Sequence, residues 1–152
     1  AVMPKAEHDN LAEFLIRRGH GDLVFCGDLD GLSLENYIDL CMRYDRTDEL
    51  ENLLESHGSE IILEICNWGR DDVYSAFFLI GIYMLGKGKI DCTKRMIDTA
   101  AETGINELLV DAIKLATFVS GADRNGGNDL SQKVIEAMDL NSNRQLALLN
   151  VL

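Results

Sequence analysis

Apolar residues recur along this chain at intervals of three and four, the spacing of amphipathic α-helices, and strand-like alternation is almost absent. We therefore predict an all-α fold in a single domain covering residues 1–152. Segments rich in glycine and aspartate predict a loop over residues 19–33 and a turn over residues 121–128. The expected helices cover residues 5–18, 34–45, 47–57, 59–66, 70–86, 90–103, 106–120, 129–139 and 143–151.

The most apolar segment runs from Val73 to Leu85. It is too short to span a bilayer, which takes about 20 residues. A helix that is apolar nearly all round is usually surrounded by other helices. We therefore predict that residues 70–86 form the central buried helix of a helical bundle. Asn67 is placed to cap its N-terminus, because an asparagine side chain can accept a backbone N–H of the first turn.

The composition narrows the range of partners. The chain has 14 Lys and Arg residues against 26 Asp and Glu residues, which gives a net charge of −12. This charge disfavours binding to nucleic acid or to anionic membrane surfaces and suits a basic partner. We expect no signal peptide and no membrane-spanning run, so a cytoplasmic protein is predicted.

The residues that usually carry metal or enzyme chemistry lack the required spacing. The four cysteines are far apart and form no C-x-x-C pair, which favours reduced core residues in an intracellular protein. The three histidines have no metal-like spacing, and neither a phosphate-binding loop nor a nucleophile elbow is present. We therefore expect no enzyme activity, no metal and no cofactor. The cysteines are Cys26, Cys41, Cys66 and Cys92.

The tetrad NWGR at residues 67–70 resembles the first homology motif of the Bcl-2 family of apoptosis regulators, where it opens the central buried helix. The segment RNGGNDL at residues 124–130 resembles the second motif, a turn before a helix. Residues 40–45 and 10–15 are similar to the third and fourth motifs. The four matches follow the order of the family and cover nearly the whole chain.

The resemblance implies a Bcl-2-like helical bundle that inhibits apoptosis by sequestering the BH3 helices of pro-apoptotic family members in a surface groove. It implies a survival-type protein similar to compact virus-encoded members. The protein would reach the mitochondrial surface only through its partners, and a homodimer is left open.

The resemblance also implies roles for single residues. Arg70 would form an ion pair with an aspartate of the ligand helix, and Gly69 would let the ligand backbone come close. Asn67 would cap the central helix or bond to the ligand, Trp68 would fill the core, and Glu64 would meet a basic ligand residue. The groove-lining candidates are Leu50, Leu54, Ile61, Val73 and Phe77. Ordinary core packing for these apolar residues, and pairing of Arg70 with a neighbouring aspartate, are left open.

Two departures from the family pattern bear on these roles. Asn128 stands where the family usually has tryptophan, which predicts a restricted set of ligands. Tyr44 replaces the small residue of the third motif and would clash inside another protein's groove. We therefore expect residues 40–45 to keep a structural role, which favours a survival protein over a killer.

The main alternative is an α-helical repeat scaffold for protein interaction. Leu11, Phe14, Leu15 and Gly19 recur at one constant offset as Leu50, Leu53, Leu54 and Gly58. Helical-hairpin solenoids show such patterns. A second alternative, an acidic mimic of nucleic acid, would need its acidic residues clustered on one face, and here they are spread along the chain.

Overall fold

A computed structural model of the chain describes residues 5–19, 33–66, 68 and 75–151. Every regular element in these ranges is an α-helix, which confirms the predicted all-α class for this part of the chain. The helices fall into two compact units, Ala1–Leu50 and Glu51–Leu152. A single domain over residues 1–152 stays a prediction.

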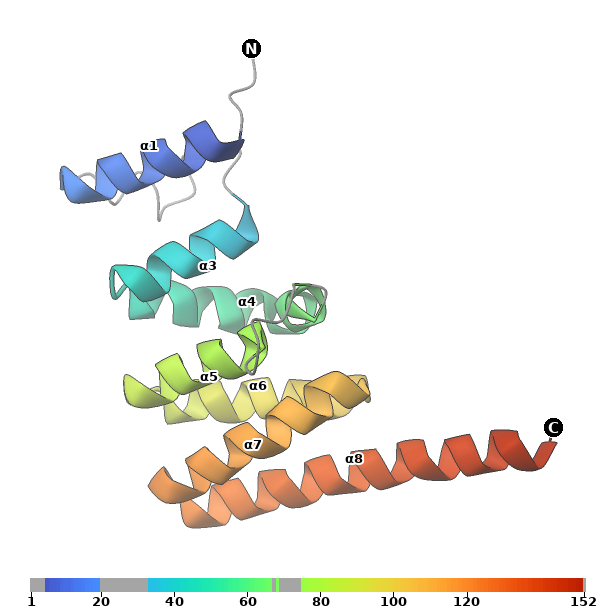
Figure 1. Ribbon diagram of the computed structural model, residues 1–152. Helices are drawn as coiled ribbons and strands as arrows, with labels where there is room; N and C mark the ends of the chain where they lie inside the picture. The colour runs from blue at the N-terminus through green and yellow to red at the C-terminus, as the bar shows by residue number, and fades with distance from the viewer. Residues whose placement is uncertain (1–4, 20–32, 67, 69–74, 152) are drawn as a thin grey trace. The chain divides into compact units, whose positions relative to one another are not determined.

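The first unit contains α1 (Lys5–Arg17), α3 (Leu34–Arg43) and the start of α4 (Thr47–Ile65) (Figure 1). Ser33 is the N-cap of α3, because its hydroxyl accepts a hydrogen bond from the backbone N–H of Asn36 at 3.2 Å. The helices expected over residues 5–18 and 34–45 are thus confirmed within two residues. Among its described side chains, the buried apolar ones are Ala12, Ile38, Leu40, Cys41 and Leu50.

The sequence predicts two short helices that meet at Gly58, and the structure has one helix, α4, with a kink. The kink lies at His57, whose backbone leaves the helical region with φ −135° and ψ 29°. The two predicted helices are therefore present as the two halves of α4. Leu54, Ile61, Ile62 and Ile65 are its buried residues in the second unit.

The apolar helix α5 (Ala76–Gly86) begins later than expected. Ser75 is its N-cap, with an extended backbone and a hydroxyl that accepts the N–H of Phe78 at 3.2 Å. The predicted start near residue 70 is therefore wrong, because this serine rather than an earlier residue satisfies the first-turn donors. Asn67, the predicted cap, lies outside the described residues.

The remaining helices follow α5 through short connections and pack mainly in chain order. They are α6 (Ile90–Thr103), α7 (Asn106–Ala122) and α8 (Arg124–Val151). Helix α5 packs against α6 and α7, α6 packs against α7 and α8, and α7 packs against α8. Consecutive helices run in alternating directions (Figure 1). The central position expected for residues 70–86 is not confirmed, because it is α7 that packs against α5, α6 and α8.

Two close approaches hold α5 against its neighbours. A side-chain Cβ at Gly81 would lie 2.9 Å from Cδ1 of Leu115, so a larger residue there would require the buried Leu115 side chain to move. On α6, the Thr93 hydroxyl donates to the Lys89 carbonyl oxygen at 3.1 Å and lies 3.5 Å from that of Gly81. Both Leu115 and Thr93 are fully buried.

The turn predicted over residues 121–128 is wrong. Helix α7 continues to Ala122 and α8 starts at Arg124, so Asp123 alone joins them. Asp123 can do so because its carboxylate accepts the N–H of Gly126 at 3.1 Å, while its own N–H donates to the Val119 carbonyl at 2.7 Å. The two helices predicted for residues 129–151 form the single helix α8.

The boundary between α6 and α7 is where the sequence places it. Gly104 adopts φ +67°, the left-handed conformation that commonly ends a helix. Asn141 of α8 supports this turn, because its side-chain amide donates to the Gly104 carbonyl at 2.7 Å. Within the described ranges, no helix has both the length and the apolar content that crossing a bilayer requires.

Candidate functional site

The groove predicted from the sequence stays a prediction, because four of its nine residues fall outside the described part of the chain. Asn67, Gly69, Arg70 and Val73 lie outside the described residues. Glu64 is exposed on α4. The remaining candidates are buried, with exposed fractions of 0% for Leu50, 7% for Leu54, 3% for Ile61 and 0% for Phe77.

A cavity of about 290 Å³ lies beside the tryptophan, between the end of α4, the start of α5 and the start of α7. We call it the Trp68 cavity. Trp68 is half-buried in its wall rather than fully packed in the core, which corrects the predicted core position. The described lining residues are Ile65, Cys66, Trp68, Ser75, Phe77, Glu107, Leu108 and Asp111.

The Trp68 cavity combines an apolar wall with two carboxylates. Phe77 and Leu108 are buried, and Asp111 is 3% exposed, so its carboxylate is almost wholly removed from water. Glu107 is exposed on the same helix face one turn earlier, with Oε2 4.0 Å from the Cys66 sulfur. The described lining includes no lysine or arginine. The described part of the lining therefore contributes negative charge and no positive charge.

The sequence reasoning missed the α7 side of this cavity. Asp111 stands between Leu108 and Leu115 at helical spacing, so it falls on the stripe that α7 turns inward. An acidic residue on an apolar stripe is rarely buried without a polar role. This pattern was visible in the sequence and is the signal that could have found the site.

A smaller cavity of about 190 Å³ lies between α4 and α6 and is more polar. An ion pair closes part of its rim, because Arg95 Nη2 lies 2.7 Å from Glu55 Oε1. Its lining residues are Leu54, Glu55, Gly58, Ser59, Ile62, Cys92, Arg95, Met96, Asp98 and Thr99.

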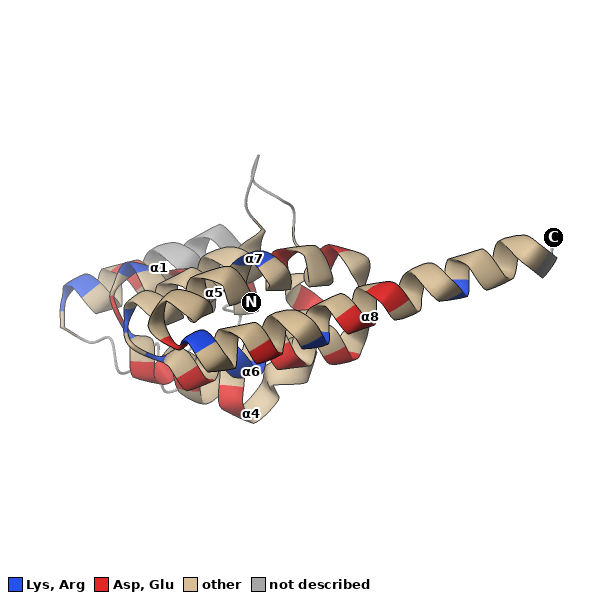
Figure 2. Cartoon of the chain, turned by 90° about the horizontal axis from the view of Figure 1, so that it is seen from below, with Lys and Arg blue, Asp and Glu red and all other residues tan. Residues whose placement is uncertain are grey.

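Acidic residues are spread over α4, α6 and α8, whereas α5 carries no charged residue (Figure 2). Several cations of the second unit are paired with these acids. Lys89 Nζ lies 3.4 Å from Glu51 Oε1, and Lys133 pairs with Asp98. Lys94 pairs with Asp123, and the hydrogen bond between them raises the pKa of Lys94 and lowers the pKa of Asp123.

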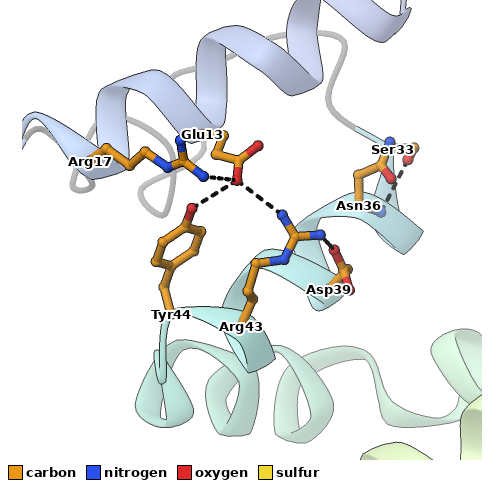
Figure 3. A network of polar contacts seen from close by, with 7 residues as sticks. All are labelled: Glu13, Arg17, Ser33, Asn36, Asp39, Arg43 and Tyr44. Atoms are coloured by element: carbon orange, nitrogen blue, oxygen red, sulfur yellow. Dashed lines mark hydrogen bonds and ion pairs between the residues drawn. The ribbon is translucent and has the colours of Figure 1, made fainter.

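A polar network in the first unit converges on one carboxylate oxygen (Figure 3). Glu13 Oε1 accepts from the Tyr44 hydroxyl at 3.0 Å and from the Arg17 and Arg43 guanidiniums at 3.0 and 3.3 Å. The hydrogen bond from Tyr44 and the two guanidiniums hold the pKa of Glu13 below its ordinary value. Arg43 also pairs with Asp39. Tyr44 thus ties its segment to α1, while its expected clash in another protein's groove stays a prediction.

The described cysteines are free thiols. Burial raises the pKa of Cys41 to about 12 and that of Cys92 to about 11, so both stay protonated near neutral pH. Cys66 is half-buried at the Trp68 cavity. Among the described residues, no group of three or more His, Cys, Asp and Glu side chains could hold a metal ion.

Helices α5 and α7 also leave apolar side chains in solvent. We call Leu79, Val110 and Phe118 the α5–α7 face. Their exposed fractions are 43%, 40% and 55%. The ring of Phe118 meets the buried ring of Phe78 edge-on, with centroids 5.9 Å apart, so it is held in place without being covered.

Comparison of the chain with protein-family models, curated proteins and solved structures finds no match. Function is therefore inferred from two features of the second unit. One is the Trp68 cavity with its buried carboxylate, and the other is the apolar α5–α7 face. Both involve helix α7.

Proposed function

We propose that this chain is a protein-interaction module of the α-helical repeat class and that its α5–α7 face binds an amphipathic helix of a partner protein. The observation that carries the proposal is the exposure of Leu79 on α5 and of Val110 and Phe118 on α7, with the exposed Lys114 between the two α7 residues along the helix. Packing of successive helices mainly in chain order is typical of helical-repeat scaffolds and supports it further.

The energetic argument starts from the exposed apolar surface. Phe118 and Leu79 each keep close to half of their surface in water. Covering such surface contributes roughly 25 cal/mol per Å² of apolar area. Neighbouring exposed apolar side chains are a usual mark of an interaction site. Because Phe118 rests on Phe78, little conformational freedom would be lost when a partner packs on it.

Charge selects the type of helix that would bind. The chain has a net charge of −12, while α5 contributes no charge at all. A partner helix would therefore present apolar residues to the α5–α7 face and carry basic residues on its flanks, where the surrounding acidic field favours them.

Capture of BH3 helices and inhibition of apoptosis stay predictions that come from the sequence resemblance. Two local features give them less support. The NGG segment lies in the first turn of α8 instead of a turn before a helix, and α5 begins at Ala76 instead of at the NWGR tetrad. Helix recognition is the part of that hypothesis retained in the proposal.

The test is a selection of helical peptides displayed on phage against the full chain, followed by calorimetry. Phe118→Asp places a charge on the α5–α7 face and should weaken the selected peptides at least tenfold, about 1.4 kcal/mol. Leu146→Asp is the matched control, because Leu146 is 59% exposed on α8, outside this face. Failure to select any peptide, or equal losses for both variants, would contradict the proposal.

BH3 peptides belong in the same titration. Their binding, together with a loss of more than about tenfold on Arg70→Ala, would favour the apoptosis hypothesis over the general one. If the selected peptides need Phe118 for binding and BH3 peptides do not bind, the repeat-scaffold hypothesis is favoured.

A further inference from the structure

We propose that the Trp68 cavity binds the guanidinium group of an arginine side chain that belongs to a partner protein. The partner is the one invoked in the proposed function, so this inference deepens that proposal. The cavity lies at the start of α7, next to Val110 of the α5–α7 face, whereas Phe118, the residue of that face chosen for mutation, lies near the end of α7.

The size of the cavity fits one side chain. Its volume of about 290 Å³ is at the lower limit of sites for small molecules, which run from roughly 300 to 1,000 Å³. Apolar groups of Phe77, Leu108 and Ile65 form part of its wall and would pack against the methylene stem of a long side chain. The methylene groups of a long basic side chain would thus contact the apolar wall, and its charged end would contact a carboxylate.

The carboxylates supply the charge. Asp111 and Glu107 are four residues apart on α7 and both line the cavity. Asp111 also interacts within the chain, but a carboxylate offers about four lone-pair sites, so it can accept further hydrogen bonds from a ligand. Because Asp111 is 3% exposed, an ion pair formed there is weakly screened by solvent.

The tryptophan distinguishes arginine from lysine. A guanidinium is planar, stacks on aromatic faces and is less strongly hydrated than an ammonium. It also matches carboxylate oxygens in a bidentate pair. Trp68 lines the cavity, and tryptophan is the aromatic residue that attracts cations most strongly. The geometry therefore favours an arginine side chain over a lysine side chain.

The cavity can be tested with a small probe, because Trp68 is the only tryptophan of the chain and its fluorescence reports on the site. The probe is N-acetyl-L-arginine amide, titrated against the full chain. A saturable change in Trp68 fluorescence is expected. The corresponding citrulline amide has nearly the same shape without the charge and should give no saturable change. Equal responses to both probes would overturn the proposal.

Two carboxylate variants locate the binding. Glu107→Gln should weaken the arginine probe at least threefold, and because Glu107 is exposed the fold should tolerate the change. Asp139→Asn, an equally conservative change on an exposed residue of α8, should leave binding unchanged. Asp111→Asn should abolish binding, with circular dichroism used to confirm that the variant is folded. If both Glu107→Gln and folded Asp111→Asn bind the arginine probe as tightly as the wild type, the assignment of the binding site to the Trp68 cavity is wrong.

The same chemistry could come from this chain, because Arg70 stands two residues after Trp68 in the sequence. Arg70→Ala separates the two sources. If the variant binds the arginine probe with an affinity within about threefold of the wild type, the arginine that fills the cavity belongs to a partner. A rise of more than tenfold would mean that Arg70 competes for the cavity, and it would overturn the assignment to a partner.

Failure here can be distinguished from failure of the proposed function. If the arginine probe does not bind but selected peptides still depend on Phe118, only the cavity assignment is wrong. If the probe binds while no peptide is selected, the arginine site in the cavity is supported and the binding of a helix by the α5–α7 face is contradicted.

Discussion

The two units of this protein are stabilised in different ways. In the first unit, α1 and α3 are joined by an exposed network in which three donors share one oxygen of Glu13 (Figure 3). In the second unit, helices approach closely at glycines, and at Gly127 a Cβ would collide with the backbone of Ser120. The first arrangement depends on pH and the second on side-chain volume, so the two units should respond to different perturbations.

The glycines of the second unit show how strict its packing is. A Cβ at Gly127 would lie 2.5 Å from the Ser120 backbone nitrogen and 2.6 Å from its Cα. A Cβ at Gly126 would meet only side-chain ends, namely Asp123 Oδ2 at 2.7 Å and Lys94 Cε at 2.8 Å. The contact of Gly127 with backbone cannot relax without moving a helix, whereas flexible side chains can shift.

The largest effect is expected for Leu115→Ala. Leu115 is fully buried where α5 meets α7, so the substitution removes packed methyl groups and leaves a cavity. The free energy of unfolding should fall by about 2–5 kcal/mol. Urea unfolding followed by circular dichroism measures this. Leu149→Ala, at a residue that is 66% exposed, is the control and should change stability by less than about 0.5 kcal/mol. A Leu115 effect as small as that of the control would refute the packing described.

An intermediate effect is expected for Gly127→Ala. The added methyl group collides with the backbone of Ser120 and should lower the free energy of unfolding by roughly 1–3 kcal/mol. Gly126→Ala should cost clearly less, because the groups it meets can move. Gly121→Ala, where nothing lies within 4 Å, should stabilise α7 by up to about 1 kcal/mol through helix propensity. Equal costs for Gly126 and Gly127 would contradict this ranking.

The smallest effect is expected for Tyr44→Phe, and it should depend on pH. The pKa of Glu13 is lowered in the folded state, mainly by the hydrogen bond from Tyr44. Its contribution to stability is therefore present above the ordinary carboxyl pKa of about 4.3 and is lost as the pH falls through the lowered value. The melting temperature of Tyr44→Phe should lie slightly below that of the wild type at pH 7.

The difference between Tyr44→Phe and the wild type should disappear at about pH 2, where the Glu13 carboxyl is protonated in both proteins. Thermal melts at the two pH values measure it. In a Glu13→Ala background, which removes the acceptor, Tyr44→Phe should have no further effect at pH 7. A difference that persists at low pH would show that the tyrosine acts through packing and not through this hydrogen bond.

The comparison of the two units also shows which features of the fold can be predicted from the sequence. The caps and stops that depend on a single residue type were readable, such as Ser33 before α3 and Gly104 after α6. The NGG segment predicts a turn from the sequence, because glycines favour turns locally. Here they serve instead to bring the start of α8 close to the end of α7. Local preference and tertiary packing both select glycine, so the sequence could not distinguish them.

The candidate site was predictable only in part. Trp68 stood out as the single tryptophan, but its wall partners Glu107 and Asp111 come from a helix some forty residues later. Helical spacing shows that Asp111 lies on an inward stripe, yet it does not show which helices that stripe faces. The cavity therefore became visible only once α4, α5 and α7 were placed together.

The sequence by itself determined the all-α class, most helix boundaries and the acidic character, because helical periodicity, capping residues and net charge are local or additive properties. The tertiary structure decided that α7 packs against α5, α6 and α8, that Asp123 alone joins α7 to α8, and that a buried carboxylate lines a cavity beside Trp68. These features depend on which helix faces meet. That choice is made by packing among distant segments, and no local pattern encodes it.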